Sequence, residues 1–196
     1  MTSARENPFA VDRVESLIQF EPAWLNTDWD AILANFEDLE YRAAIVGPHG
    51  SGKTTFFDTF RPILESKTNF RVIQLFLNED KRSLTRHEKL FLTNCPANDS
   101  IVIFLDGEEQ FGFFDRLEFS RLTYGFGGVL ISRHKKSRSF KTLLETTTSP
   151  DMLRDFVNRI APDSPMTDPE IEAAFEKAEG NIRDALRLIY DQVADD

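Results

Sequence analysis

The sequence predicts an α/β fold, in which a parallel five-stranded sheet is flanked by helices and followed by a small group of C-terminal helices. Short apolar runs that are typical of buried strands alternate with segments that carry apolar residues at helical spacing. A glycine-rich stretch joins the first apolar run to the helix that follows it. From residue 149 onward the chain has helical patterns and no strand pattern.

The α/β part is expected to span residues 27–148, after an irregular N-terminal arm over residues 1–26. Thr27 is predicted to cap the first helix, over 28–41, because its hydroxyl can accept a backbone N–H there. The helix that starts near Thr54 is expected to kink or end at Pro62. Strands are expected over 42–46, 70–77, 100–105, 128–132 and 140–146, with further helices over 84–93 and 111–123.

Residues 149–196 are predicted to form three helices, with a proline-containing linker at 161–166. Ser149, Thr167 and Asn181 stand where each helix needs a cap. Helices totalling about 45 residues make a weak core by themselves. This segment is therefore expected to pack against the sheet as a small lid, with the linker as a hinge.

The composition indicates a water-soluble, cytoplasmic chain of 196 residues. We find no apolar run long enough to span a membrane and no secretory signal at the start of the sequence. The lone Cys95 excludes a disulfide within the chain, and the scattered histidines show no metal-ligand spacing. The net charge of −10 argues against nucleic-acid binding by the whole surface.

The stretch from Gly47 to Thr54 fits the phosphate-binding pattern G-x-x-x-x-G-K-[ST], the P-loop. Its glycines allow successive backbone N–H groups to turn inward around phosphate oxygens. Lys53 is expected to reach the β- and γ-phosphates, and the Thr54 hydroxyl to bind Mg²⁺. The predicted nucleotide-binding residues are Gly47, Pro48, His49, Gly50, Ser51, Gly52, Lys53, Thr54 and Thr55.

A second motif is the apolar run 101–105, which ends in Asp106. At the carboxyl end of a buried strand, this aspartate would lie beside the P-loop and help to hold Mg²⁺. Many P-loop ATPases place a glutamate directly after the aspartate, where this chain has Gly107. Asp106 to Gln110 resembles the D-G-x-[DE]-[EQ] variant of the signal-transduction and NACHT-like ATPases. This resemblance implies that Glu108 or Glu109 is the candidate base for the attacking water, although acids also favour the first turn of a helix.

These motifs together resemble the AAA+ ATPases, over about residues 28–194. Gly47 to Thr54 resembles Walker A, Ile101 to Asp106 resembles Walker B, and Asp106 to Gln110 is similar to a variant of the NACHT-like ATPases. Gly180 to Leu186 resembles the start of the last lid helix. The resemblance implies that Arg183 is the sensor 2 arginine, which reaches the γ-phosphate. It implies a sensor 1 residue among Ser132, Arg133 and His134.

The segment 133–141 is basic in an otherwise acidic chain. Three interpretations stay open: an arginine finger from Arg133 or Arg138 acting in a neighbouring subunit, a solvated loop, or a contact to a nucleic-acid backbone. The adjacent Phe113 and Phe114 cannot both face the core if they lie on one helix.

The sequence thus predicts a Mg²⁺-dependent ATPase that binds ATP and ADP and couples the nucleotide state to lid movement and to a partner. That partner is a second copy or another protein, and turnover is expected to be slow in the monomer. The alternatives are a nucleotide-dependent switch that does not hydrolyse, which Gly107 favours, and a phosphotransferase acting on a small molecule.

Overall fold

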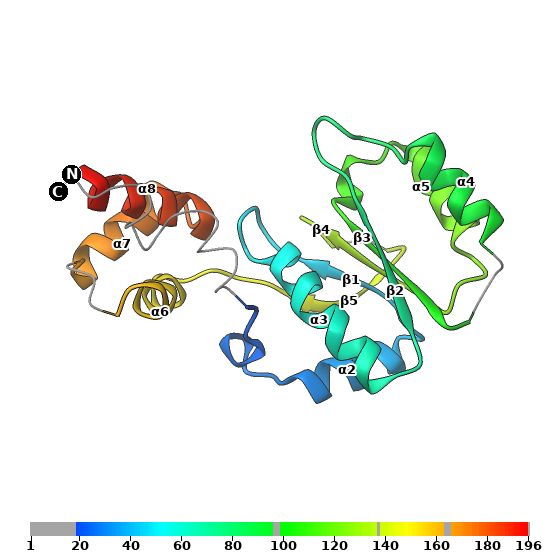
Figure 1. The fold of residues 1–196 in the computed structure, drawn as a ribbon, viewed down its shortest axis with the longest axis horizontal. Helices are drawn as coiled ribbons and strands as arrows, with labels where there is room; N and C mark the ends of the chain where they lie inside the picture. The colour runs from blue at the N-terminus through cyan, green and yellow to red at the C-terminus, as the bar shows by residue number, and fades with distance from the viewer. Residues whose placement is uncertain (1–18, 96–98, 137, 163–165, 196) are drawn as a thin grey trace.

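The computed structural model describes residues 19–95, 99–136, 138–162 and 166–195, so most of the predicted N-terminal arm lies outside the described residues. All strand pairs are parallel, and the five strands lie in the order β2-β3-β4-β1-β5 (Figure 1). This confirms the predicted fold class. The strands are β1 (Arg42–Val46), β2 (Arg71–Phe76), β3 (Ile101–Asp106), β4 (Gly128–Arg133) and β5 (Lys141–Glu145).

The central strands are buried on both faces, which explains their unbroken apolar sequences. In β1, Ala43 and Ile45 face one side of the sheet, and Ala44 and Val46 face the other. The first face is covered by α2 (Trp29–Asp38) and α3 (Lys53–Lys67), and the second by α4 (Arg86–Asn94) and α5 (Phe113–Leu122). The molecule therefore has three layers here, with the sheet in the middle.

Helix α3 does not end at Pro62, because it continues to Lys67. A proline removes one helical hydrogen bond, but α3 buries Phe56, Phe60 and Leu64 completely. We attribute the continuation to this packing on both sides of the proline. The predicted cap at Thr27 is also wrong, since Asp28 is the cap and its Oδ1 accepts the N–H of Ala31 at 2.8 Å.

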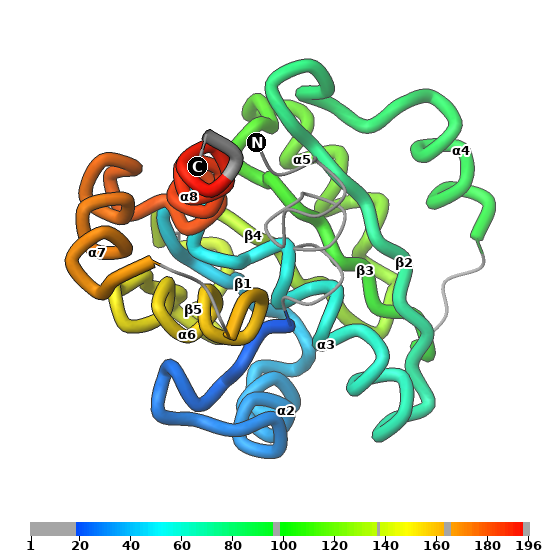
Figure 2. Tube along the Cα trace, turned by 60° about the vertical axis from the view of Figure 1, so that its left-hand side comes forward, coloured from blue at the N-terminus to red at the C-terminus, as the bar shows by residue number. Residues whose placement is uncertain are grey.

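The C-terminal helices α6 (Pro150–Ile160), α7 (Asp168–Lys177) and α8 (Ile182–Asp195) pack on one another beside the sheet (Figures 1 and 2). The predicted caps Ser149 and Asn181 and the Thr167 capping box are present. The three helices have a buried core of their own, and the one residue from elsewhere in the described chain that packs against that core is Trp24. The expectation that these helices cannot form a core without the sheet is therefore wrong.

Trp24 belongs to a short 3-10 helix, η1 (Pro22–Leu25), in the part of the arm that the structure describes. Its ring lies edge-on to Phe156 of α6 at 4.9 Å between centroids. Phe20, four residues earlier, is buried against Phe56 of α3 at 5.1 Å. The arm therefore connects the C-terminal helices to the sheet domain.

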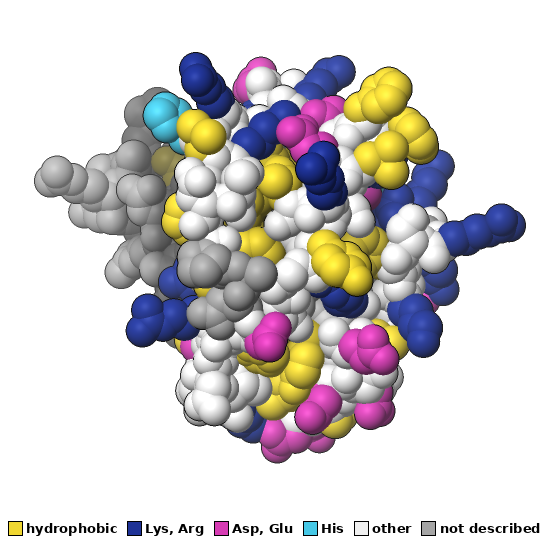
Figure 3. Space-filling view, turned by 90° about the vertical axis from the view of Figure 1, so that its right-hand side faces the viewer, with side chains coloured by type: hydrophobic (Ala, Val, Ile, Leu, Met, Phe, Trp, Pro, Cys, Tyr) yellow, Lys and Arg dark blue, Asp and Glu magenta, His cyan; other side chains and the backbone are white. Residues whose placement is uncertain are grey.

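The face formed by α4 and α5 carries exposed apolar side chains among basic ones (Figure 3). Phe113 and Phe114 are 68% and 82% exposed, so both point away from the core, whereas Phe111 and Phe119 are buried. None of the helices in the described residues has the length and apolar character that a membrane crossing needs.

Candidate nucleotide-binding site

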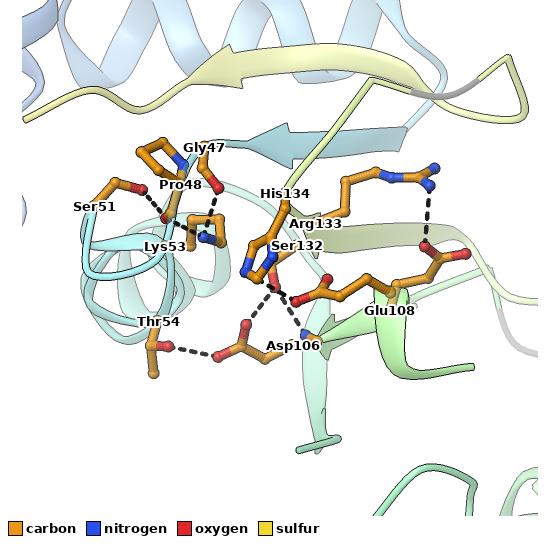
Figure 4. Close-up of polar contacts among 12 residues, drawn as sticks. Gly47, Pro48, Ser51, Lys53, Thr54, Asp106, Glu108, Ser132, Arg133 and His134 are labelled. Carbon is orange, nitrogen blue, oxygen red and sulfur yellow. Dashed lines mark hydrogen bonds and ion pairs between the residues drawn. The ribbon is translucent and has the colours of Figure 1, made fainter. Parts of the chain in front are cut away.

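A cavity of about 830 Å³ lies between the P-loop, the carboxyl ends of β2 and β3, the start of α8 and residues of the arm. This volume is ample for a nucleotide. The predicted residues from His49 to Thr55 line the cavity, together with Asp106, Glu109 and Arg183. Gly47, Pro48 and Glu108 do not line it, although they stand beside it (Figure 4).

The P-loop has the backbone that its glycines permit. Gly50 and Gly52 have φ values of +69° and +83°, which side chains disfavour. The ammonium of Lys53 lies inside the loop and donates to the carbonyl oxygens of Gly47 at 2.8 Å and Pro48 at 2.6 Å. Burial lowers the pKa of Lys53, and the nearby carboxylates of Glu109 and Asp106 oppose that shift. The charge of this lysine is available for a phosphate that displaces the loop carbonyls.

The end of β5 supports the P-loop through Thr146, a residue that the sequence analysis did not identify. The hydroxyls of Ser51 and Thr146 lie 2.6 Å apart, and Thr146 is buried. A Cβ on Gly47 would lie 2.0 Å from the Thr146 hydroxyl, so only glycine fits at this contact. Thr146 carries no local motif, and only the strand order reveals its role.

Thr54 and Asp106 meet as the motifs predict. The Thr54 hydroxyl donates to Oδ2 of Asp106 at 2.6 Å, and the other carboxylate oxygen accepts from Ser132 of β4. A hydroxyl and a carboxylate are hard oxygen ligands of the kind that Mg²⁺ prefers, with phosphates and water completing its shell. The chemistry of this pair fits the predicted metal.

Gly107 explains why no glutamate follows Asp106. Its φ is +83°, and a Cβ there would lie 2.4 Å from the carbonyl oxygen of Leu77. Any side chain at this position would therefore strain the backbone and collide with the backbone of Leu77, just after β2. The backbone N–H of Gly107 donates to the Ser132 hydroxyl at 2.9 Å, which ties the turn to β4.

The two glutamates after Gly107 form the 3-10 helix η2 (Glu108–Gln110) and point to different places. Glu108 is buried, with Arg116 at 2.8 Å and Arg133 at 3.6 Å, so it faces two guanidinium groups away from the cavity. Glu109 lines the cavity, and its Oε1 lies 3.2 Å from Nε2 of His134. Glu109 is therefore the carboxylate that the fold presents to the site.

His134 follows β4, whose last residue Arg133 pairs with Val46 just before the P-loop, so its side chain lies beside the P-loop (Figure 4). Its ring lies 4.6 Å from that of His49 in the P-loop. Burial is the largest influence on the pKa of His134 and lowers it, and Lys53 and His49 lower it as well. The carboxylates of Glu109 and Asp106 act in the opposite direction and raise the pKa. The net direction is downward, so the imidazole is mainly neutral near pH 7.

The C-terminal helices reach the P-loop through the start of α8. Asn181 caps this helix, and its Oδ1 would lie 2.0 Å from a Cβ at Gly50. Arg183, in the first turn of α8, is exposed and lines the cavity. Among the ion pairs of the described residues none involves Arg183, so its guanidinium is available to a ligand.

The cavity has two unlike sides. We call the P-loop, Asp106, Glu109 and His134 the polar wall. The opposite side, which we call the apolar wall, is contributed by the arm and the C-terminal helices and consists of Trp24, Met152, Phe156 and Ile182. The sequence analysis did not place these residues at the site, because Trp24, Met152 and Phe156 belong to no motif and Ile182 was given no role in its segment.

Comparison with known proteins gives the same class of fold. No family model matches the chain, and no curated protein matches it by sequence. Among the solved structures that are similar in fold is Cdc6p from Pyrobaculum aerophilum, with a TM-score of 0.59 and 14% identity over 91% of this chain and 64% of that chain. Drosophila ORC bound to DNA has a TM-score of 0.63 and 12% identity over 99% of this chain and 61% of that chain. The Aeropyrum pernix Orc1 protein in complex with DNA has a TM-score of 0.61 and 15% identity over 93% of this chain and 62% of that chain.

The chain is therefore structurally similar to AAA+ proteins of the Cdc6/ORC type, and its strand order 2-3-4-1-5 is typical of P-loop NTPases. At 12–15% identity the likeness concerns the fold alone. The chain spans less than two thirds of the length of each of these structures.

Proposed function

We propose that this chain is an ATP-binding module that hydrolyses ATP with Mg²⁺. The observation that carries the proposal is that one cavity gathers the P-loop, the Thr54–Asp106 pair, an acidic residue and an unpaired lid arginine. A turn that only joined a strand to a helix would have no need of this set. We also propose the division into an arm (1–26), a core (27–148) and a lid (149–196).

The polar wall fits a triphosphate. The P-loop N–H groups and the positive end of the α3 dipole favour its charge, and Lys53 would exchange the carbonyls of Gly47 and Pro48 for phosphate oxygens. Thr54 and Asp106 would hold Mg²⁺. When bound, the ion neutralises charge that develops on the phosphates.

The apolar wall fits the base and part of the ribose. Trp24, Met152 and Phe156 offer rings and a thioether on which a flat purine can lie. The sequence lacks the N-K-x-D motif that reads guanine, and this absence supports adenine as the base.

Lid movement would couple to the nucleotide through Arg183. An arginine that binds the γ-phosphate favours the arrangement in which α8 lies close to the P-loop, so loss of that phosphate would weaken the closed state. The contact of Asn181 with Gly50 is the part of this arrangement that exists without nucleotide.

A second candidate function is a nucleotide-dependent switch that does not hydrolyse ATP. Gly107 favours this function, because it stands where many P-loop ATPases have the glutamate that acts as the base. Glu109 favours hydrolysis, since it returns a carboxylate to the cavity. A phosphotransferase is the third candidate, and it would consume ATP only when an acceptor is supplied.

We also propose two kinds of partner, a neighbouring subunit and a nucleic acid. Arg133 is turned toward Glu108, so Arg138, which is exposed, is the better candidate for a finger in a neighbouring subunit. Two of the similar structures contain DNA. In this chain such a contact would use Lys135, Arg138 and Lys141, which are exposed.

The test is Mg²⁺-dependent ATP turnover over a range of protein concentrations, with ATP binding measured in parallel and Lys53→Ala as the control. Turnover per molecule that rises with concentration and is lost in Lys53→Ala supports an ATPase that acts as an oligomer. Arg138→Ala should then remove the rise. Tight ATP binding without turnover at any concentration supports the switch, and absence of ATP binding overturns the nucleotide site.

A further inference from the structure

Three titratable side chains from three separate segments meet inside the cavity. His49 comes from the P-loop, Glu109 from η2 and His134 from the end of β4, and all three line the cavity. Nε2 of His134 lies 3.2 Å from Oε1 of Glu109, and the rings of His134 and His49 are 4.6 Å apart. None of the motifs of the sequence predicts that these residues meet.

We propose that His134 and Glu109 form a catalytic pair, in which the His134 imidazole accepts the proton of the attacking water and Glu109 holds that imidazole in the accepting tautomer. This inference rests on the proposed hydrolysis of ATP. In this scheme the base that acts on the water is His134, and Glu109 orients that histidine and does not act on the water itself.

The contact between the two residues favours one tautomer. Nε2 of His134 lies 3.2 Å from Oε1 of Glu109; because a carboxylate only accepts hydrogen bonds, a neutral imidazole that bonds to Glu109 would carry its proton on Nε2. In a neutral imidazole, Nδ1 is then the acceptor. The surroundings keep the ring neutral, because burial and the charges of Lys53 and His49 outweigh Glu109 and Asp106.

Glu109 is poorly placed to take a proton from water by itself. Its Oε1 faces His134, and its Oε2 is buried with no hydrogen-bond partner among the described residues. A carboxylate in this state can polarise the imidazole of His134, which also lines the cavity.

His49 restricts the ring from the other side. It belongs to the P-loop, two residues after Gly47, so the same loop that would hold the phosphates packs against the His134 ring. The position of His134 is therefore tied to the position of the phosphates, which general-base catalysis requires.

The step balances within these groups. The water oxygen forms a bond to the γ-phosphorus as its O–H bond breaks, and the proton passes to Nδ1 of His134. The bond between the γ-phosphorus and the bridging oxygen breaks, and its electron pair leaves with ADP. The imidazolium, stabilised by Glu109, then returns the proton to phosphate or solvent.

The experiment compares His134→Ala, His134→Gln and Glu109→Gln with the wild type in single-turnover ATP hydrolysis, ATP affinity and the pH profile of the rate. His134→Gln can still donate to Glu109 but cannot take up a proton. His87→Ala is the matched control, because His87 is exposed on α4, away from the cavity.

Both His134 variants should hydrolyse ATP at least about 100-fold more slowly than the wild type, because a general base contributes about 10²–10⁴ in rate. Their ATP affinity and melting temperature should be unchanged. Glu109→Gln should lose about 10-fold, since the imidazole remains. The wild-type rate should fall at acid pH, where the ring is protonated, and His134→Gln should lack this fall.

A His134→Gln variant that hydrolyses within about 3-fold of the wild type overturns the pair. The same follows if Glu109→Gln is the slower variant, because Glu109 would then act directly. A wild-type chain that binds ATP and never hydrolyses it overturns the proposed hydrolysis and the pair together. Because the wild type alone gives that result, failure of the proposed hydrolysis can be told apart from failure of the His134–Glu109 pair, which only the variants reveal.

Discussion

The polar and apolar walls of the cavity are built in opposite ways. The polar wall stands on the ends of neighbouring parallel strands, where Thr146, Ser132 and Gly107 fix the P-loop and Asp106 through short hydrogen bonds. The apolar wall stands on the arm and on helices whose buried core is separate from the sheet. Under the proposed function, the first half would carry the chemistry and the second half would move against it.

The largest effect that separates the two halves is expected from core truncation. Leu153 in α6 and Leu130 in β4 are both fully buried, so Leu153→Ala and Leu130→Ala should each cost about 2–5 kcal/mol. Leu153→Ala should speed amide hydrogen exchange only in α6–α8, and Leu130→Ala throughout the sheet. If both variants instead speed exchange over the whole chain, the two halves form one cooperative unit.

The second effect tests the rigidity of the polar wall. Gly107→Ala should lower the free energy of unfolding by about 1–3 kcal/mol, because Gly107 has a φ of +83° that alanine disfavours. The clash of the new Cβ with the carbonyl oxygen of Leu77 adds a further cost. Gly112→Ala is the control, since its φ is ordinary and its nearest contact is a side-chain oxygen of Asp115 at 3.1 Å. Denaturant titration measures both. Equal stabilities of the two variants would show that the turn after Asp106 can change its backbone conformation at little cost in free energy.

The third effect probes the apolar wall. Trp24→Ala should weaken ATP and ADP binding about 10-fold, or about 1.4 kcal/mol, and leave the rate at saturating ATP unchanged. Trp24→Phe keeps an aromatic ring toward Phe156 and should restore much of the affinity. Calorimetry and saturation kinetics separate the two quantities. A fall in the saturated rate at unchanged affinity would place the tryptophan in the chemistry of the polar wall.

The smallest effect is expected outside both walls, at the α4 capping box. Burial raises the pKa of Glu88, but Lys81 and the N–H and hydroxyl of Thr85 lower it further, so the net shift is downward. A carboxylate with a depressed pKa stabilises the fold above its unfolded-state pKa, and this stabilisation is lost as pH falls through the folded-state value. Glu88→Gln should cost about 0.5 kcal/mol at pH 7, and less in acid.

Melting curves at pH 7 and in acid measure this difference, and ATP affinity should not change. A Glu88→Gln variant that loses as much stability in acid as at pH 7 would contradict the assigned role. A loss of ATP affinity would show that the loop before α4 belongs to the site.

The sequence by itself determined the parts that rest on neighbouring residues. The caps at Ser149 and Asn181 depend on contacts within a few positions, and the P-loop and the apolar run that ends in Asp106 have patterns that can be recognised in consecutive residues, so the sequence predicts them. The alternating burial of the strands follows equally from their composition.

The tertiary structure alone decided the rest. Glu108 and Glu109 are adjacent and chemically identical, and only the positions of Arg116, Arg133 and His134 set one facing away from the cavity and the other into it. Trp24, Met152 and Phe156 of the apolar wall belong to no motif, and only the packing of the arm and of α6 brings them to the cavity. These contacts join residues far apart in sequence, and strand order and packing fix them rather than any local preference of the chain.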